Sequence, residues 1–112
     1  SQLHQVVWNL CENAMRYGLD KPLITLACGI NDELDRPYLD VIDSGNGISE
    51  GIKEQLFEPF FTTEAKGSGL GLYLARELCE ANQASLGLQS SSEKGTVFRI
   101  NFMHMNKQDV LI

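Results

Sequence analysis

Four polar residues recur close together on a predicted helix, namely Asn9, Glu12, Asn13 and Arg16. Their spacing of i, i+3, i+4 and i+7 places them within about 100° of arc on one side of an α-helix. Carboxamide and carboxylate oxygens suit Mg²⁺, and a guanidinium group suits phosphate. The stripe is therefore a candidate site for a metal ion and a phosphate, although the spacing alone leaves open an ordinary solvated helix face.

A further acid lies at the end of a predicted strand. Asp43 has the same parity as Val41, so if Val41 faces the core, the Asp43 carboxylate faces it too. A carboxylate there needs a hydrogen-bond donor, and the amino group of a heterocyclic ligand would serve. Gly45 and Gly47 would let the backbone approach that ligand closely. A plain turn over DSGNG stays open, but an EF-hand calcium loop is excluded because its sixth position would be Ile48 instead of glycine.

A glycine-rich stretch, KGSGLGLYLAREL at 66–78, runs directly into a predicted helix. The unpaired backbone N–H groups and the positive dipole end of a helix N-terminus bind phosphate. The stretch matches neither the P-loop pattern nor the dinucleotide-binding fingerprint, and a flexible hinge is the alternative interpretation. Taken with the carboxamides and Asp43, it predicts a site for Mg·ATP that uses no P-loop.

The elements that position these residues follow from the hydrophobic periodicity. Adjacent pairs of strands, which do not alternate singly with helices, favour an α+β fold in which helices cover one face of a largely antiparallel sheet. On the first strand, one face is expected to carry Ile24, Leu26, Cys28 and Ile30. The periodicity predicts helices over 3–17, 50–56 and 69–81, and strands over 23–30, 38–43, 86–90 and 96–102.

Composition narrows the class of protein. The 112 residues suffice for one domain, expected over 1–105 with a tail at 106–112, and the domain is expected to be monomeric in isolation. A net charge of −6 with nine Lys and Arg residues disfavours a nucleic-acid partner. No apolar run approaches the roughly 20 residues that span a membrane. The three cysteines fall in apolar patterns and are expected to be buried.

Five segments resemble, in family order, the motifs of the catalytic ATP-binding domain of sensor histidine kinases, a superfamily shared with DNA gyrase. The subgroup that controls type IV pilus genes is the most similar, followed by the nitrogen-regulatory class. The segments are NLCENAMRYG at 9–18 (N box), DSGNGIS at 43–49 (first glycine box), FEPFFTT at 57–63 (F box), KGSGLGLYLARELCE at 66–80 (second glycine box) and KGTVF at 94–98.

This resemblance implies the Bergerat α/β sandwich, a mixed and mostly antiparallel sheet covered on one face by three helices. It also implies roles for single residues. Asn13 resembles the asparagine that binds Mg²⁺, Asn9 is a second candidate ligand near the phosphates, and Arg16 resembles the phosphate contact; these three would be catalytic. Tyr17 would flank adenine, and Asp43 would accept from its amino group. The other expected nucleotide contacts are Gly45, Gly47, Ile48, Phe60, Thr62, Thr63, Lys66, Gly67, Ser68, Gly69, Leu70, Gly71, Leu72 and Thr96.

Position 9 bears on the reaction. The gyrase-like ATPases carry a glutamate there, whereas this chain has Asn9, and an amide cannot act as a general base. The resemblance therefore implies a protein histidine kinase that transfers the γ-phosphoryl group of ATP to a histidine on a separate helical dimerisation domain. A response regulator and a parent protein anchored in the bacterial inner membrane are further expectations. The alternatives are an ATPase or an anti-sigma-type serine kinase of the same superfamily, or a non-catalytic nucleotide-binding module.

Two further hypotheses concern surfaces. Trp8 and Met15 widen the apolar arc of the first helix, and we expect part of this surface to dock against the helical domain; a core position for Trp8 is the alternative. The segment 62–66, which corresponds to the ATP lid of the family, is expected to be disordered without nucleotide.

Overall fold

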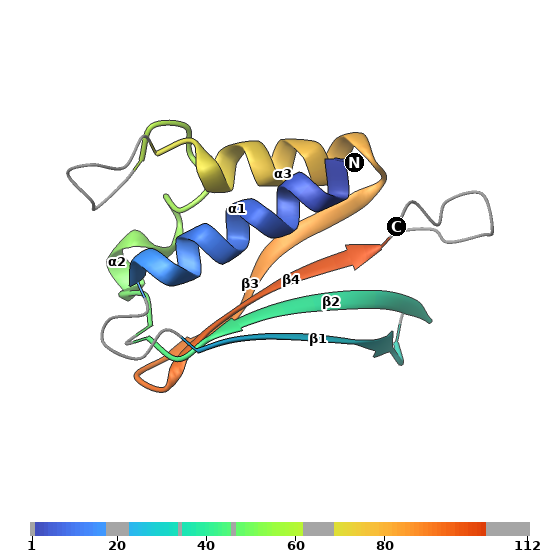
Figure 1. The fold of residues 1–112 in the computed structure, drawn as a ribbon, viewed down its shortest axis with the longest axis horizontal. Helices are drawn as coiled ribbons and strands as arrows, with labels where there is room; N and C mark the ends of the chain where they lie inside the picture. The colour runs from blue at the N-terminus through green and yellow to red at the C-terminus, as the bar shows by residue number, and fades with distance from the viewer. Residues whose placement is uncertain (1, 18–22, 34, 46, 62–68, 103–112) are drawn as a thin grey trace.

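The computed structural model describes residues 2–17, 23–33, 35–45, 47–61 and 69–102. Figure 1 shows a helical layer above a single twisted sheet, which confirms the predicted α+β class. Every expected element is present, with bounds that differ by a few residues. In chain order the elements are α1 (Gln2–Tyr17), β1 (Ile24–Asn31), β2 (Arg36–Asp43), α2 (Glu50–Lys53), α3 (Gly71–Ala81), β3 (Ala84–Ser92) and β4 (Gly95–Phe102).

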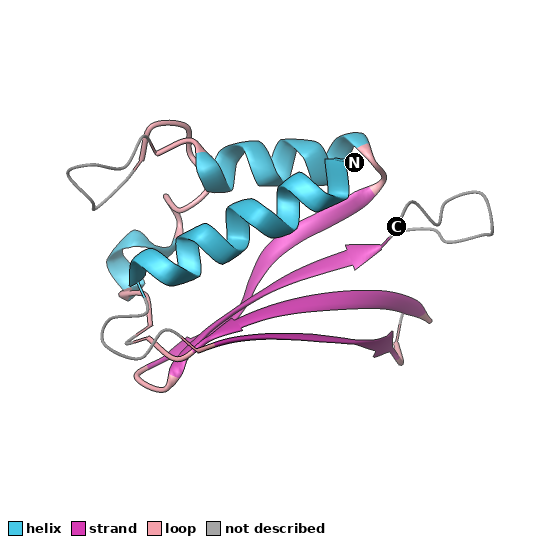
Figure 2. Cartoon of the chain, viewed as in Figure 1, coloured by secondary structure: helices cyan, strands magenta, loops and turns pink. Residues whose placement is uncertain are grey.

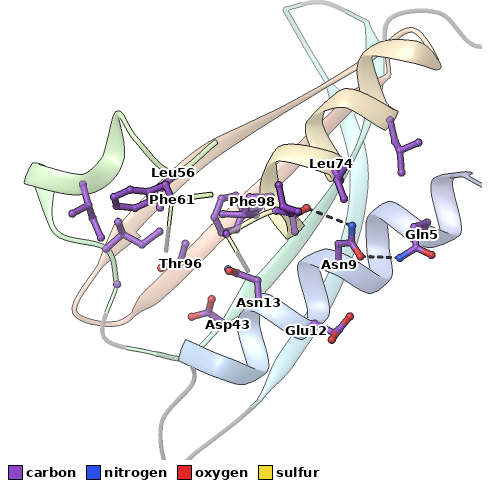
Figure 3. Close-up of a pocket in the computed structure, with 18 of the residues that line it drawn as sticks. Gln5, Asn9, Glu12, Asn13, Asp43, Leu56, Phe61, Leu74, Thr96 and Phe98 are labelled. Carbon is purple, nitrogen blue, oxygen red and sulfur yellow. Dashed lines mark hydrogen bonds between the residues drawn. The ribbon is translucent and has the colours of Figure 1, made fainter. Parts of the chain in front are cut away.

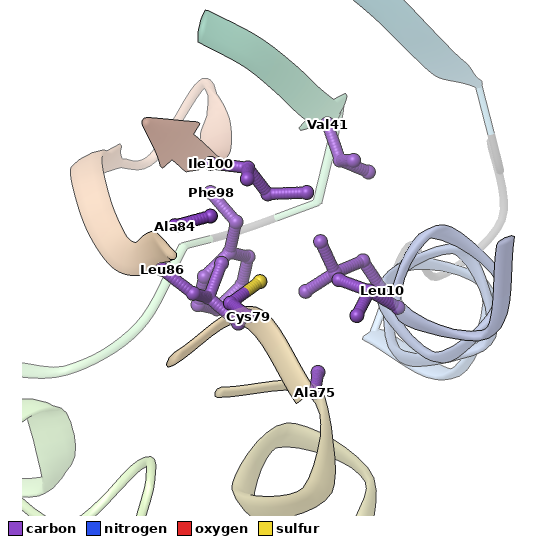
Figure 4. Close-up of a cluster of buried hydrophobic side chains, with 9 residues drawn as sticks. Leu10, Val41, Ala75, Cys79, Ala84, Leu86, Phe98 and Ile100 are labelled. Carbon is purple, nitrogen blue, oxygen red and sulfur yellow. The ribbon is translucent and has the colours of Figure 1, made fainter. Parts of the chain in front are cut away.

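The sheet is antiparallel throughout the described residues, with the strand order β1-β2-β4-β3. Helices α1 and α3 lie side by side over one of its faces (Figure 2). Alternate residues of β2 and β4 point toward the helices because side chains alternate across a strand. Figure 4 shows the resulting core, in which Leu10 and Ala75 from the helices meet Val41, Phe98 and Ile100 from the sheet.

The opposite face of the sheet carries a buried ion pair. Arg99 on β4 donates two hydrogen bonds to Asp40 on β2, from Nε to Oδ1 at 2.7 Å and from an Nη to Oδ2 at 2.9 Å. The guanidinium group also stacks 3.9 Å from the centre of the Tyr38 ring. The hydrogen bond to Asp40 raises the pKa of Arg99. The ion pair is bidentate and largely shielded from water, since the side chains of Arg99 and Asp40 are 19% and 9% exposed.

The apolar face of β1 is less covered than its sequence pattern predicts. Leu26 and Ile30 share the helix side with Val41 and its neighbours, yet each is more than half exposed. Helix α1 packs mainly over β2, so the helical layer stops short of this edge strand. The prediction that all three cysteines are buried holds for Cys79 alone. Cys28 on β1 is exposed for the same reason as its neighbours, and Cys11 on α1 is half-buried. Burial raises the pKa of the Cys79 thiol on α3 to about 11.

Two helices are shorter than predicted. Helix α2 ends at Lys53 and gives way to turns, and α3 begins at Gly71, two residues later than expected. The delay arises because Gly69 has a φ of +75°, a left-handed conformation that no right-handed helix accommodates. Within the described ranges, none of the helices combines the length and the apolar character that a membrane crossing requires.

Candidate functional site

A cavity of about 670 Å³ lies between the three helices and the sheet, where β2 ends and β4 begins (Figure 3). Ligand pockets in proteins commonly have volumes of this order. The wall combines polar groups from α1 and the sheet with apolar groups from α2 and α3. It is lined by Gln5, Asn9, Glu12, Asn13, Asp43, Gly47, Ile48, Ser49, Ile52, Leu56, Phe61, Gly69, Leu70, Gly71, Leu72, Leu74, Leu78, Thr96 and Phe98.

Helix α1 supplies the carboxamides at the cavity. The Oδ1 atom of Asn9 accepts from Gln5 Nε2 at 2.8 Å, and its Nδ2 donates to the carbonyl of Gly71 at 3.4 Å. Asn9 therefore ties α1 to the first turn of α3. Asn13 lies one turn further along and lines the same cavity, and its side chain makes no hydrogen bond within the part of the chain that the structure describes. Its carboxamide is thus available to a ligand.

The sheet supplies an acid and a hydroxyl that lie opposite each other. Asp43, the last residue of β2, pairs with Thr96 on β4, and both side chains are buried on the helix side of the sheet. One carboxylate oxygen of Asp43 accepts the backbone N–H of Gly45 at 2.9 Å. The parity argument from the sequence therefore placed Asp43 correctly on the cavity side. Figure 3 shows both side chains at the cavity, close to Asn13.

The loop that follows Asp43 is held against the β3–β4 hairpin. Gly47 has a φ of +84°, and a Cβ atom at this position would lie 2.2 Å from the carbonyl oxygen of Ser92. Only glycine fits there. The next residue, Ile48, donates its backbone N–H to the Ser91 hydroxyl at 2.6 Å. The loop therefore approaches the hairpin as closely as its backbone allows, and Ile48 lines the cavity.

The N-terminus of α3 forms the other wall. Gly69, with its left-handed φ, accepts the backbone N–H of Phe60 at 2.8 Å through its carbonyl oxygen. The helical hydrogen bonds begin with Leu74 donating to the carbonyl of Leu70 at 2.8 Å. Helix geometry leaves the N–H groups of Gly71, Leu72 and Tyr73, the first three residues of α3, without an intrahelical acceptor, and they lie at the positive end of the helix dipole. Because Leu70 and Gly71 line the cavity, this end of α3 is placed to receive an anion.

Ten of the residues predicted from the sequence meet at this cavity. Gly45 and Phe60 do not line it; Phe60 is 74% exposed, and the neighbouring Phe61 lines the cavity in its place. Arg16 and Tyr17 belong to α1, but the positions of their side chains are outside the description. Thr62, Thr63, Lys66, Gly67 and Ser68 fall outside the described residues, as does the predicted disorder of the lid. The ten are Asn9, Asn13, Asp43, Gly47, Ile48, Gly69, Leu70, Gly71, Leu72 and Thr96.

Nine lining residues were absent from the expected nucleotide contacts, although one of them, Glu12, belongs to the polar stripe that the sequence indicates on α1. Gln5 had a signal, because it lies four residues before Asn9 and therefore on the same side of α1. Leu74 and Leu78 continue the apolar spacing of α3, which reads equally well as core. Nothing in their local pattern separates the apolar residues that line a cavity from those that fill a core. The nine are Gln5, Glu12, Ser49, Ile52, Leu56, Phe61, Leu74, Leu78 and Phe98.

Two solved structures show the similarity of the fold. A mycobacterial sensor histidine kinase, MprB, superimposes with a TM-score of 0.76 at 24% identity, over 91% of this chain and 72% of that one. Full-length ShkA in complex with AMPPNP superimposes with a TM-score of 0.74 at 24% identity, over 91% of this chain and 21% of that one. These similarities support the fold.

Sequence relatives are closer. The sensor protein kinase PilS of Pseudomonas aeruginosa is 48% identical over 109 residues, which cover 95% of this chain and 21% of that protein. Sporulation kinase A of Bacillus subtilis is 36% identical over 102 residues, which cover 91% of this chain and 16% of the kinase. The chain thus spans about a fifth or less of the length of these relatives. Residues 1–106 match the family model described as histidine kinase-, DNA gyrase B- and HSP90-like ATPase, and the chain belongs to that family.

Proposed function

We propose that this chain is the Mg·ATP-binding catalytic domain of a sensor histidine kinase and that it donates the γ-phosphoryl group to a histidine on a separate helical dimerisation domain. In the same proposal, the parent protein is anchored in the bacterial inner membrane and passes the phosphoryl group on to a response regulator. The observation that carries the proposal is the convergence, around one cavity, of a buried acid, a buried hydroxyl, two carboxamides and a helix N-terminus. These groups suit an amino-bearing ring at one end and phosphates at the other.

The residues present fit a magnesium ion. Asn13 brings a carboxamide oxygen to the cavity without a competing hydrogen bond in the described ranges, whereas both polar atoms of Asn9 are engaged. Asn13 is therefore the better candidate ligand for the metal ion, and Asn9 is the second candidate. When bound, Mg²⁺ would offset the charge of the phosphates, which this chain of net charge −6 needs.

Transfer is favoured over hydrolysis by the chemistry of position 9. The Asn9 amide cannot take a proton from water, and its contacts with Gln5 and Gly71 hold it in a structural role. The chain would then contribute binding, orientation and charge stabilisation, which are the main sources of catalysis in phosphoryl transfer.

Mixing the chain with its helical domain and radiolabelled Mg·ATP tests this proposal. We expect acid-labile label on a histidine of the helical domain, and we expect Asn13→Ala to lower the transfer rate by about 100-fold because the metal loses an oxygen ligand. Asn31→Ala, at the end of β1 that is remote from the cavity, serves as the control. Rapid release of inorganic phosphate would instead favour the ATPase alternative, and nucleotide binding without transfer would favour the non-catalytic module.

The partner of this domain would contact an exposed apolar surface on α1. Trp8 is 60% exposed and Met15 is 62% exposed, so the alternative that Trp8 belongs to the core is wrong. Tryptophan and methionine are enriched at contact sites between proteins relative to the rest of the surface, and Trp8 and Met15 lie two turns apart on the same side of α1. We assign this surface to the helical domain, because it lies on α1 away from the carboxamides that line the cavity.

Replacing Trp8 with glutamine should therefore separate docking from nucleotide binding. We expect autophosphorylation of the intact kinase to fall about 10-fold, while the affinity of the isolated domain for an ATP analogue stays unchanged. Trp8→Phe retains an aromatic surface and should lose much less activity. Equal autophosphorylation rates in the glutamine variant and the wild type would rule out this surface as the docking site.

A further inference from the structure

The hydroxyl group of Ser91 joins two parts of the cavity wall. It accepts the backbone N–H of Ile48 at 2.6 Å, and it lies 3.2 Å from the hydroxyl oxygen of Thr96. Ser91 and Thr96 are directly opposite each other on β3 and β4. An irregularity in β3 between Leu88 and Ser90 produces this pairing, because it shifts the register of the strand by one residue. One side chain therefore connects the loop after Asp43 with the hydroxyl at the cavity.

The proton positions follow from counting donors and acceptors. Ser91 carries one hydroxyl proton, and its oxygen already accepts from Ile48. Within the described ranges, Thr96 is the one acceptor in reach of that proton. If Thr96 donated to Ser91 instead, the Ser91 proton would be left without a partner in a partly buried place, which is costly. If Ser91 donates to Thr96, the Thr96 proton is the one left over, and an acceptor on a ligand in the cavity can take it. With such a ligand bound, this is the arrangement in which both hydroxyl protons have a partner.

The cavity then presents an acceptor and a donor on neighbouring strands. Asp43 is the acceptor and Thr96 the donor, and the two residues are paired across β2 and β4. A purine with an amino group at position 6 offers the complementary pattern, a donor next to a ring-nitrogen acceptor. A purine with an oxo group there offers an acceptor next to an N–H donor, which mismatches both protein groups. A reversed Thr96 hydroxyl would remove half of this discrimination.

We propose that Ser91 is a positioning residue that determines base specificity, because it orients the Thr96 hydroxyl as a donor and anchors the Ile48 backbone. The proposal rests on the proposed function, since it requires the cavity to take a purine nucleotide. The absence of space between Gly47 and the hairpin strengthens it, because a Cβ atom on Gly47 would lie 2.9 Å from the Ser91 hydroxyl oxygen. The loop is packed too closely against the hairpin to shift and replace the hydrogen bond between Ile48 and Ser91 if that bond were lost.

Calorimetric titration with the non-hydrolysable analogues AMPPNP and GMPPNP, both with Mg²⁺, tests the role of Ser91. We expect the wild-type chain to prefer the adenine analogue, and we expect Ser91→Ala to lower that preference about 10-fold, mainly through weaker AMPPNP binding. Ser91→Thr keeps a hydroxyl and should restore the preference. Ser92→Ala is the matched control, because among the described residues its hydroxyl accepts only the Lys94 N–H, in the hairpin turn.

The results distinguish a failure of the proposed role of Ser91 from a failure of the proposed nucleotide binding. If Ser91→Ala weakens both analogues equally, or leaves the preference unchanged while the protein stays folded, Ser91 does not set specificity. A Ser91→Thr variant that fails to restore the preference also contradicts the proposal. If the wild-type chain binds neither analogue, the proposed function itself fails together with this inference.

Discussion

Replacing Asp43 with asparagine should abolish useful nucleotide binding, with a loss of about 100-fold in affinity for a non-hydrolysable ATP analogue in the presence of Mg²⁺. The asparagine oxygen can still accept the N–H of Gly45, so the loop should remain in place. The other atom, however, changes from a carboxylate oxygen to an N–H donor in a buried position. The new N–H donor would then face the N–H donor of the ligand. The complex loses a charge-assisted hydrogen bond, and both donors are left without an acceptor in a buried place.

Isothermal titration calorimetry measures this effect directly. The control is Asp32→Asn, which makes the same change of charge in an exposed turn and should leave the affinity unaltered. Asp43→Ala should behave like the asparagine variant with respect to binding. An asparagine variant that binds within about threefold of the wild type would mean that the carboxylate does not read the base.

Replacing Arg99 with methionine should produce the largest loss of stability, about 3 kcal/mol in the free energy of unfolding. The side chains of Arg99 and Asp40 are only 19% and 9% exposed. Removal of the guanidinium would leave the Asp40 carboxylate buried without its partner, and an uncompensated buried charge typically costs about 3–5 kcal/mol. The lost stacking on Tyr38 adds to this cost.

Urea denaturation followed by circular dichroism gives the comparison. Lys53→Met is the matched control, because Lys53 pairs with Glu50 at a similar distance of 2.6 Å but Glu50 is almost fully exposed. That substitution should cost less than about 1 kcal/mol. The double variant Asp40→Leu/Arg99→Met should recover most of the lost stability, since it removes both charges. A single Arg99 variant as stable as the Lys53 variant would show that water already solvates Asp40.

The alternation of side chains explains why part of the site was predictable. Parity placed Asp43 on the cavity side, and the spacing of Asn9 and Asn13 placed both on one side of α1. Each of these conclusions depends only on the geometry of a single regular element. The α+β class was predictable for a similar reason, since it follows from the order in which the elements occur.

Other features depend on tertiary structure that no local pattern contains. The register shift in β3 makes Ser91, and not Ser90, the partner of Thr96, and three serines in succession give no sign of it. The choice of Phe61 over Phe60 as a lining residue follows from a φ of 67° at Phe60 in an irregular segment. The exposure of Leu26 was equally hidden, because periodicity shows which residues share a face but not where the covering layer ends.

The ion pair between Asp40 and Arg99 has a consequence for the cavity on the other side of the sheet. Asp40 lies opposite Arg99, and three residues further along β2, Asp43 lies opposite Thr96. If the two strands slipped by one residue, Asp40 would turn into the hydrophobic core and Asp43 would turn away from the cavity. A slip by two would separate Asp40 from its cation. The ion pair between Asp40 and Arg99 therefore disfavours misaligned pairings of β2 and β4. In this way two charges remote from the cavity keep Asp43 opposite Thr96.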